Sequence, residues 1–221
     1  MTQPQPPSPR PQPLVLASSS PRRRELLAEA GYEFTVVPPP PEIECGVCSE
    51  SGPAGLVAEL AYRKAQAVVG LLQDEEISRG PTIAWRRFPS PGSHAPIVIA
   101  ADTVAECDGF TLGKPHDEED ARAMLRQLSG REHRVLTGLC LWRLGDRGPL
   151  VQVAVTTLKM DPLTGAQLDE YLASGQWEGK AGAFGYQDRL GWVHTVEGSE
   201  SNVVGLPMEL LAEMLAELPS D

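Results

Sequence analysis

The sequence of 221 residues lacks any run of about 18 apolar residues, so none of its segments is expected to cross a membrane as a helix. Its first residues, MTQPQPPSPRPQP, also lack the apolar core of a signal peptide and contain too much proline to fold. We therefore expect a cytoplasmic protein without a membrane partner. We further expect residues 1–13 to form a disordered, proline-rich tail before one domain over 14–221; a proline-rich ligand segment is the alternative for the tail.

Cysteine is also scarce, with four residues in the chain. Cys45 and Cys48 form a CGVC pair, whereas Cys107 and Cys140 stand alone. A zinc site needs two further ligands, and no second pair or closely spaced histidines supply them. The pair lies in a loop rich in proline, glycine and serine, unlike a thioredoxin-type centre, which precedes a helix. We expect free thiols; a zinc or redox protein built on this pair is the rival reading.

Basic residues are outnumbered, because 19 lysines and arginines face 30 aspartates and glutamates, giving a net charge of −11. This balance argues against a nucleic-acid partner. It does not exclude a small anionic substrate, because charges are screened over about 8 Å. Whether a cleft binds an anion therefore depends on the cationic side chains that line it, not on the net charge.

Such a cluster occurs in LVLASSSPRRRELLAEAG. Residues 14–17 predict a short buried strand. Ser20 is a natural N-cap, and Pro21 suits the first position of a helix that Gly31 can end. Arginines 22–24 then occupy the first turn, at the positive end of the helix dipole. Together with the unpaired N–H groups they favour a bound anion such as phosphate; a solvated basic turn is the alternative.

A second helix is predicted over residues 53–72 by apolar residues that recur at helical spacing. Its predicted buried stripe contains Val57, Leu60, Ala61, Val68 and Leu71. Lys64 falls on the same stripe, so its ammonium group either extends to the rim or points into a cleft toward an anion. Residues 73–95 are polar and rich in turn formers, which predicts an excursion at the surface.

The continuous apolar run 97–101 predicts a strand buried on both faces, ending at Asp102 and Thr103. Ligands of α/β sheets gather at the carboxyl ends of strands, so Asp102 is a catalytic candidate, although aspartate also forms turns there. Lys114 follows in a constrained Gly-Lys-Pro turn, a position that can aim a side chain.

The remaining pattern predicts further elements of an α/β fold. Strands are expected at 34–37, 134–144, 150–160 and 190–196, and helices at 117–128, 164–173 and 206–218. Between them, GKAGAFGYQD gathers three glycines around Lys180 and Gln187. This segment is either a loop for close approach to a ligand or a plain tight turn.

Seven motifs taken in order, SSSPRRRELL, RKA, AADT, GKP, LSGREH, KAGAFGYQ and VVGLP, resemble the Maf family of nucleoside triphosphate pyrophosphatases. The resemblance runs from about Leu14 to the terminal helix and omits the tail and the excursion at 73–95. It implies an elongated central mixed sheet flanked by helices, similar to inosine triphosphatases, with two lobes and a substrate cleft. Homodimers occur in the family.

The resemblance also implies an activity. Family members split a nucleoside triphosphate between its α and β phosphates, and they use a divalent metal, usually Mg²⁺ or Mn²⁺. Position by position, the phosphate-binding residues of the family match Ser18, Arg22, Arg23, Lys64 and Lys114. Asp102 matches the proton acceptor that activates water. The positions associated with base preference match Arg23, Thr103 and Gln187.

The loop after the second strand departs from the family pattern. An acidic pair is usual there, but PPEIEC has Cys45 in place of the second acid, leaving Glu42 and Glu44. Because Mg²⁺ prefers oxygen ligands, we expect Glu44 and Asp102 to be the metal ligands.

The base preference is expected from KAGAFGYQ, which resembles the branch of the family that prefers dTTP and UTP. A glutamine amide at position 187 matches N3–H and O4 of uracil or thymine, although the flipped amide suits cytosine. We expect hydrolysis of dTTP, UTP and related modified pyrimidine nucleotides, with a role in removing modified nucleotides or in arrest of cell division. The alternatives are a 7-methyl-GTP pyrophosphatase on the same scaffold and a nucleotide-binding regulator of cell division.

Overall fold

The computed structural model describes residues 12–44, 51–78, 95–186 and 191–218. Within these ranges none of the helices is long and apolar enough to cross a membrane. The expectations for most of the tail, for Cys45 and Cys48, for residues 79–94 and for Gln187 fall outside the described residues. Cys107 and Cys140 are buried free thiols, as expected, and burial raises the pKa of Cys140 to about 12.

A mixed seven-stranded sheet forms the centre of the molecule. Its strands are β1 (Leu14–Leu16), β2 (Phe34–Val36), β3 (Ile97–Cys107), β4 (Phe110–Leu112), β5 (Glu132–Arg143), β6 (Leu150–Met160) and β7 (Val193–Glu197). The order is β2-β1-β3-β5-β6-β7, with β4 paired to β3. The pairs of β1 with β2 and β3 are parallel and all other pairs are antiparallel, which confirms the predicted mixed sheet.

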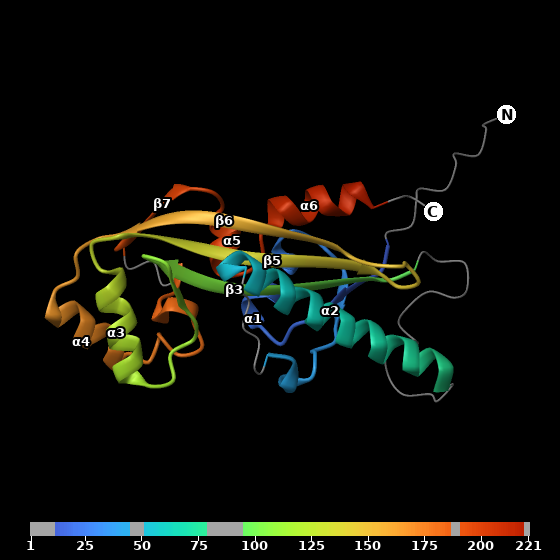
Figure 1. Cartoon of the computed structure of the whole chain (residues 1–221), viewed down its shortest axis with the longest axis horizontal. Helices are drawn as coiled ribbons and strands as arrows, with labels where there is room; N and C mark the ends of the chain where they lie inside the picture. The colour runs from blue at the N-terminus through green and yellow to red at the C-terminus, as the bar shows by residue number, and fades with distance from the viewer. Residues whose placement is uncertain (1–11, 45–50, 79–94, 187–190, 219–221) are drawn as a thin grey trace.

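Helices flank this sheet along an elongated molecule (Figure 1). They are α1 (Pro21–Glu29), α2 (Gly52–Ser78), α3 (Glu118–Leu128), α4 (Gly165–Ala173), α5 (Glu200–Val204) and α6 (Met208–Glu217), with short 3-10 helices η1 (Pro41–Glu44) and η3 (Ala181–Ala183). In Figure 1, α3 and α4 gather at one end of the long strands, and α1, α2 and α6 lie toward the other.

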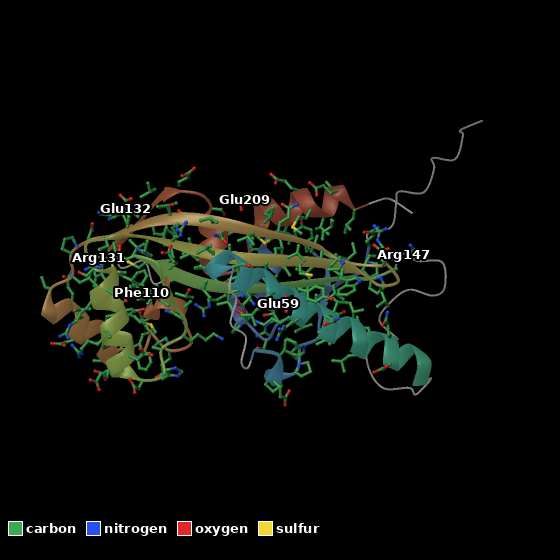
Figure 2. The ribbon with its side chains drawn as sticks, viewed as in Figure 1. Glu59, Phe110, Arg131, Glu132, Arg147 and Glu209 are labelled. Atoms are coloured by element: carbon green, nitrogen blue, oxygen red, sulfur yellow. The ribbon has the colours of Figure 1, made fainter. Side chains whose placement is uncertain are left out.

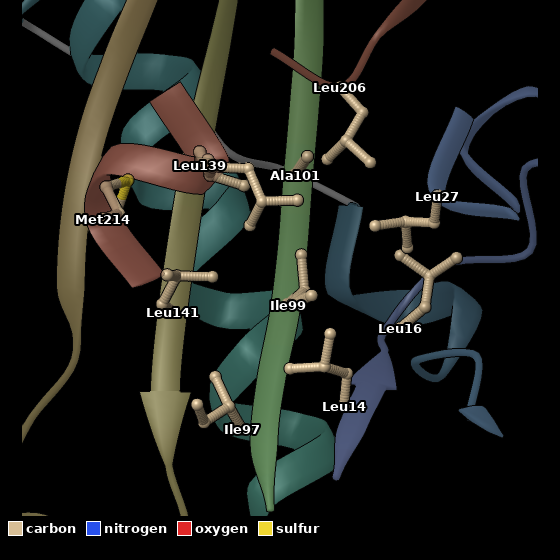
Figure 3. Packing of buried hydrophobic residues seen from close by; sticks show 11 residues of the cluster. Leu14, Leu16, Leu27, Ile97, Ile99, Ala101, Leu139, Leu141, Leu206 and Met214 are labelled. Atoms are coloured by element: carbon tan, nitrogen blue, oxygen red, sulfur yellow. The ribbon is translucent and has the colours of Figure 1, made fainter. Parts of the chain in front are cut away.

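The two faces of the sheet are covered differently. On what we term the first face, α1 and α6 pack on the β1–β3–β5 region through residues such as Leu27, Ile99 and Met214 (Figure 3). Farther along the same face, α3 and α4 form a second cluster that includes Ala105 and Leu125. The opposite, second face packs against α2. The first face therefore carries two separate groups of helices, in agreement with the predicted two-lobed architecture.

Strand β3 is longer than the sequence predicted. It continues through Asp102 to Cys107, so the expectation that Asp102 ends the strand is wrong. The cause is β5, which pairs with β3 from Ile97↔Arg143 to Glu106↔Arg134 and keeps its backbone extended. The partner on the other edge stops earlier, because β1 pairs with β3 only as far as Leu16↔Ile99. Asp102 therefore lies in the middle of a strand, just beyond the end of its neighbour.

Helix α2 also differs from its prediction, because it extends to Ser78 and takes in residues 73–78, which we had assigned to the surface excursion. Glutamine and glutamate in QDEEIS are good helix formers, so the polar composition did not end the helix. Leu71 is 41% exposed, whereas Leu72 is 1% exposed and occupies the buried stripe instead. The predicted place of Leu71 on this stripe is wrong by one position.

The other predicted helices and strands are confirmed to within a few residues. Asp117 caps α3 by accepting a hydrogen bond from the backbone N–H of Asp120, and Thr164 caps α4. The short elements β4 and α5 were not predicted, since each is too brief to show a period.

Candidate active site

A cavity of about 610 Å³ is lined by residues of α1, α2 and α3 and of the central sheet. Seven residues that the sequence analysis singled out line it together: Ser18, Arg22, Arg23, Lys64, Asp102, Thr103 and Lys114. They come from the β1–α1 junction, α2, β3 and the turn after β4. The fold therefore brings together segments that are far apart in the sequence. The side chains of Gln187 and Glu44 are outside what the structure describes.

Lys64 and Asp102 form a buried ion pair at this cavity. The lysine Nζ lies 2.6 Å from Asp102 Oδ1, and the two side chains are 6% and 13% exposed. Lys64 reaches the carboxylate because its stripe on α2 faces the second face of the sheet, toward which Asp102 also points. Of the two alternatives for Lys64, the structure selects the one directed into the cleft. A buried pair of this kind is costly to break, because the remaining charge loses its compensation.

Arg23 ties together the segments around the carboxylate. Its Nε donates to the carbonyl of Gly205 at 2.8 Å, and its Nη1 donates to the carbonyl of Ala101 at 2.8 Å. The same guanidinium reaches Ser18 Oγ and Thr103 Oγ1, each at 3.3 Å. The Ala101 carbonyl lies on the edge of β3 beyond the end of β1, so Arg23 satisfies backbone that a longer β1 would have paired.

The start of α1 forms another wall of the cavity. Ser20 occupies the N-cap position, but its side chain makes no capping bond, contrary to expectation. Instead Ser18 Oγ accepts a hydrogen bond from the backbone N–H of Ser20 at 3.2 Å. Arg22 donates from Nη2 to the carbonyl of Gly179 at 3.2 Å, joining α1 to the segment before η3. The predicted cationic first turn therefore faces the cavity.

A chain of hydrogen bonds holds the side chain of Thr103 and connects it to α5. Thr103 Oγ1 and Thr137 Oγ1 are 2.9 Å apart, and Thr137 Oγ1 donates to the backbone carbonyl of Asn202 at 3.2 Å. The buried Asn202 side chain donates in turn to the carbonyl of Val135 and to Thr156 Oγ1. These bonds anchor α5 to the sheet.

The connection from α5 to α6 is fixed by Glu209, labelled in Figure 2. Its carboxylate accepts hydrogen bonds of 2.7 Å from the hydroxyls of Ser199 and Ser201. The bond from Ser199 is the largest cause of a lowered pKa for this glutamate. The last two residues of α5, Val203 and Val204, and its C-cap Gly205 line the cavity.

The other part of the cavity is apolar. Its walls include Ala105, Leu128, Val135, Leu158 and Phe184. The ring of Phe184 lies 5.8 Å from that of Tyr171 and 6.4 Å from that of Trp192, so it belongs to an aromatic cluster. Cationic and apolar regions in one cavity suit a ligand with a polyanionic end and a flat, weakly polar end.

Two lining residues, His133 and Glu178, were missed by the sequence analysis. The motif LSGREH contributed to the family resemblance, but no role was assigned to its histidine. The register of β5 was the missing information, because it places His133 on the same face as Val135.

A metal can be held here only in part by the residues that the structure describes, which contain no cluster of three or more histidine, cysteine, aspartate or glutamate residues. Asp102, whose Oδ1 accepts a hydrogen bond from Lys64, lines the cavity. A carboxylate is a hard oxygen donor and fits Mg²⁺ or Mn²⁺, which take their remaining ligands from water and phosphate. Glu44 ends η1, whose first residue, Pro41, lines the cavity.

Comparison with known families shows to which family this chain belongs. The family model described as Maf-like protein matches residues 13–218. The chain belongs to the Maf family. A Maf relative named dTTP/UTP pyrophosphatase from Rhodopirellula baltica is 50% identical over 203 residues, covering 91% of this chain and 80% of the relative. One of the same name from Symbiobacterium thermophilum is 40% identical over 205 residues, covering 92% and 93%.

Among solved structures, a HAM1 protein from Coxiella burnetii aligns with this Maf protein at a TM-score of 0.47 and 17% identity. The alignment covers 93% of this chain and 99% of that one.

Proposed function

We propose that this Maf protein hydrolyses dTTP and UTP between the α and β phosphates, releasing the nucleoside monophosphate and pyrophosphate. The observation that carries the proposal is the ion pair of Lys64 and Asp102 at a cavity lined by further cations. The relatives named dTTP/UTP pyrophosphatase support the choice of substrate.

Each part of the cavity has a task in this reaction. Arg22, Lys64 and Lys114 hold the triphosphate, because fixed cations stabilise the charge that develops on phosphoryl oxygens during in-line attack. Asp102 accepts the proton of the attacking water, while Lys64 donates a hydrogen bond to its Oδ1. Arg23 positions Thr103 and the α5 segment through its bonds to protein. The apolar region receives the base.

Asp102 and Glu44 are the residues that would hold a divalent cation. When bound, such a cation neutralises phosphate charge and makes water easier to deprotonate.

The test of the proposed function is product analysis with the purified protein. With Mg²⁺ present, we expect pyrophosphate and monophosphate in equal amounts from dTTP and UTP, and loss of turnover after chelation with EDTA. A panel that includes CTP and 7-methyl-GTP compares kcat/KM. Higher kcat/KM for 7-methyl-GTP than for both dTTP and UTP would overturn the substrate assignment. Binding of dTTP without any pyrophosphate would instead support a regulator.

Replacement of Lys114 by methionine is expected to raise KM for dTTP by about 10- to 100-fold, with kcat changed much less. A hydrogen bond to a charged group contributes about 1.5–3 kcal/mol, and this contact is expected to be similar in the ground and transition states. Lys159→Met, on β6 and outside the cavity lining, is the matched control and should leave KM unchanged. A large fall in kcat with unchanged KM for Lys114→Met would contradict this role.

A further inference from the structure

The edge of β3 that faces β1 and β4 has a gap beside the cavity. Strand β1 pairs with this edge only as far as Ile99, and β4 begins to pair with it at Ala105. Among the described residues, no strand covers the positions between these two on this side. Asp102 and Thr103 lie in the gap, and both line the cavity. The gap therefore presents the backbone of β3 to the cavity.

The direction of each backbone group in the gap follows from the alternation of a strand. Successive residues direct their N–H and C=O groups to opposite edges. Backbone groups of Ile97, Ile99 and Ala101 all bond on the β1 side, the first two to the residues that flank β1 and the third to Arg23. The pairing of β3 with β5 runs through this region without a register shift, so the alternation continues. The N–H of Thr103 therefore points into the gap.

This N–H group directly follows the proposed general base, Asp102. The side chain of Asp102 projects from the second face, where Lys64 contacts it, whereas the N–H of Thr103 lies in the plane of the sheet. The carbonyl of Thr103 faces the same gap but lies on the far side of its residue from Asp102. The carbonyl of Ala101, which would repel an anion, is already bonded to Arg23. The gap thus offers an anion a fixed N–H donor next to the carboxylate.

We propose that the backbone N–H of Thr103 donates a hydrogen bond to a non-bridging oxygen of the phosphoryl group that water attacks. This inference rests on the proposed function and names a further contact within its site. In-line attack places negative charge on the equatorial oxygens of that group, so a donor fixed in advance stabilises the transition state. The N–H is fixed because the ladder between β3 and β5 holds its peptide plane. This role belongs to the backbone and is separate from the base preference expected of the Thr103 side chain.

Replacement of the peptide bond between Asp102 and Thr103 by an ester removes this donor and keeps the shape of the chain. The two proteins to compare are Thr103→Val and a protein with α-hydroxyisovaleric acid, the hydroxy analogue of valine, at position 103. The ester protein should have a kcat for dTTP that is ~10²–10³-fold lower, the range for loss of one oxyanion donor. A folded ester protein with the kcat and KM of Thr103→Val would overturn the proposal.

An ester at Val153 of β6, made with the same hydroxy acid, is the matched control. The N–H of Met160 bonds toward β5, so Val153, an odd number of residues earlier, directs its N–H to the outer edge. Strand β7 pairs with that edge only over residues 157–160, and Val153 is outside the cavity lining. Each ester also weakens one carbonyl that pairs with β5, so urea denaturation should show similar stability for the two. The control should retain the kcat of the wild-type protein.

Nuclear magnetic resonance tests the contact in the wild-type protein, bound to a dTTP analogue with an imido group between the α and β phosphorus atoms. We expect a scalar coupling across the hydrogen bond between the ¹⁵N of Thr103 and one ³¹P nucleus. Hydrolysis of dTTP in H₂¹⁸O shows which phosphorus water attacks, and the coupling should involve that phosphorus.

Absence of this coupling in the bound complex, or coupling to a phosphorus that water does not attack, would overturn the proposal even if the ester protein failed to fold. If the wild type hydrolysed no nucleoside triphosphate, the proposed function itself would have failed.

Discussion

Replacement of Asp102 by asparagine will lower kcat/KM for dTTP by ~10²–10⁴-fold, the range typical of a lost general base. Asparagine has nearly the shape of aspartate and can still accept a hydrogen bond from Lys64, but it cannot take a proton from water. Pyrophosphate release under single-turnover conditions measures the loss at the chemical step. Asp146→Asn, an exposed aspartate in the β5–β6 turn, is the control and should retain full activity.

The same substitution will also destabilise the fold, because Lys64 keeps a buried charge without its partner. Breaking a buried pair from one side costs about 3–5 kcal/mol, whereas removing both charges is often close to neutral. The double variant Lys64→Met/Asp102→Asn should therefore regain unfolding free energy but not activity. An Asp102→Asn enzyme with wild-type kcat/KM would remove this carboxylate from the mechanism.

Substitution of Gly138 by alanine is expected to destabilise the protein by about 1–3 kcal/mol or more, the cost of overpacking a well-filled interior. A Cβ at this position would lie 2.2 Å from the carbonyl oxygen of Val57 and 2.7 Å from the backbone nitrogen of Ala58. Both atoms belong to the backbone of α2, so no side-chain rotation relieves the clash. Helix α2 must move away from β5, and Lys64 moves with it.

Urea denaturation of Gly138→Ala measures this cost, and its turnover of dTTP reports on the displaced lysine. Gly148→Ala is the matched control, because a Cβ there meets nothing within 4 Å and the backbone is not left-handed. Unchanged stability for Gly138→Ala would mean that the contact between α2 and β5 is looser than the structure indicates.

The elements that could be predicted from sequence are those whose signals are local. Pro21 marks the start of α1, Asp117 caps α3, and a glycine-containing turn separates the strands β5 and β6. Asp102 was placed at the end of a strand because the apolar run stops there. Its extended backbone depends on pairing with β5, a tertiary effect that composition does not reveal.

The candidate site was predictable where a family motif carried it and not where it depended on register. Lys64 stands out as a charge on an apolar stripe, yet only its distance to Asp102 distinguishes a cleft from a rim. His133 looks like any histidine near the start of a strand, and its relevance follows from the residues that line the same wall. Arg23 is expected from the family motif to contact phosphate, and this contact stays a prediction; its bonds to the backbone carbonyls of Gly205 and Ala101 could not be foreseen from the motif.

The interior location of Asp102 on β3 has a further consequence for how the reacting group is held. Strand β5 continues alongside it in both directions, so turning its backbone would require breaking a ladder shared by the whole sheet. The position of the Asp102 carboxylate is therefore set by the hydrogen-bond ladder of the central sheet rather than by the conformation of a loop.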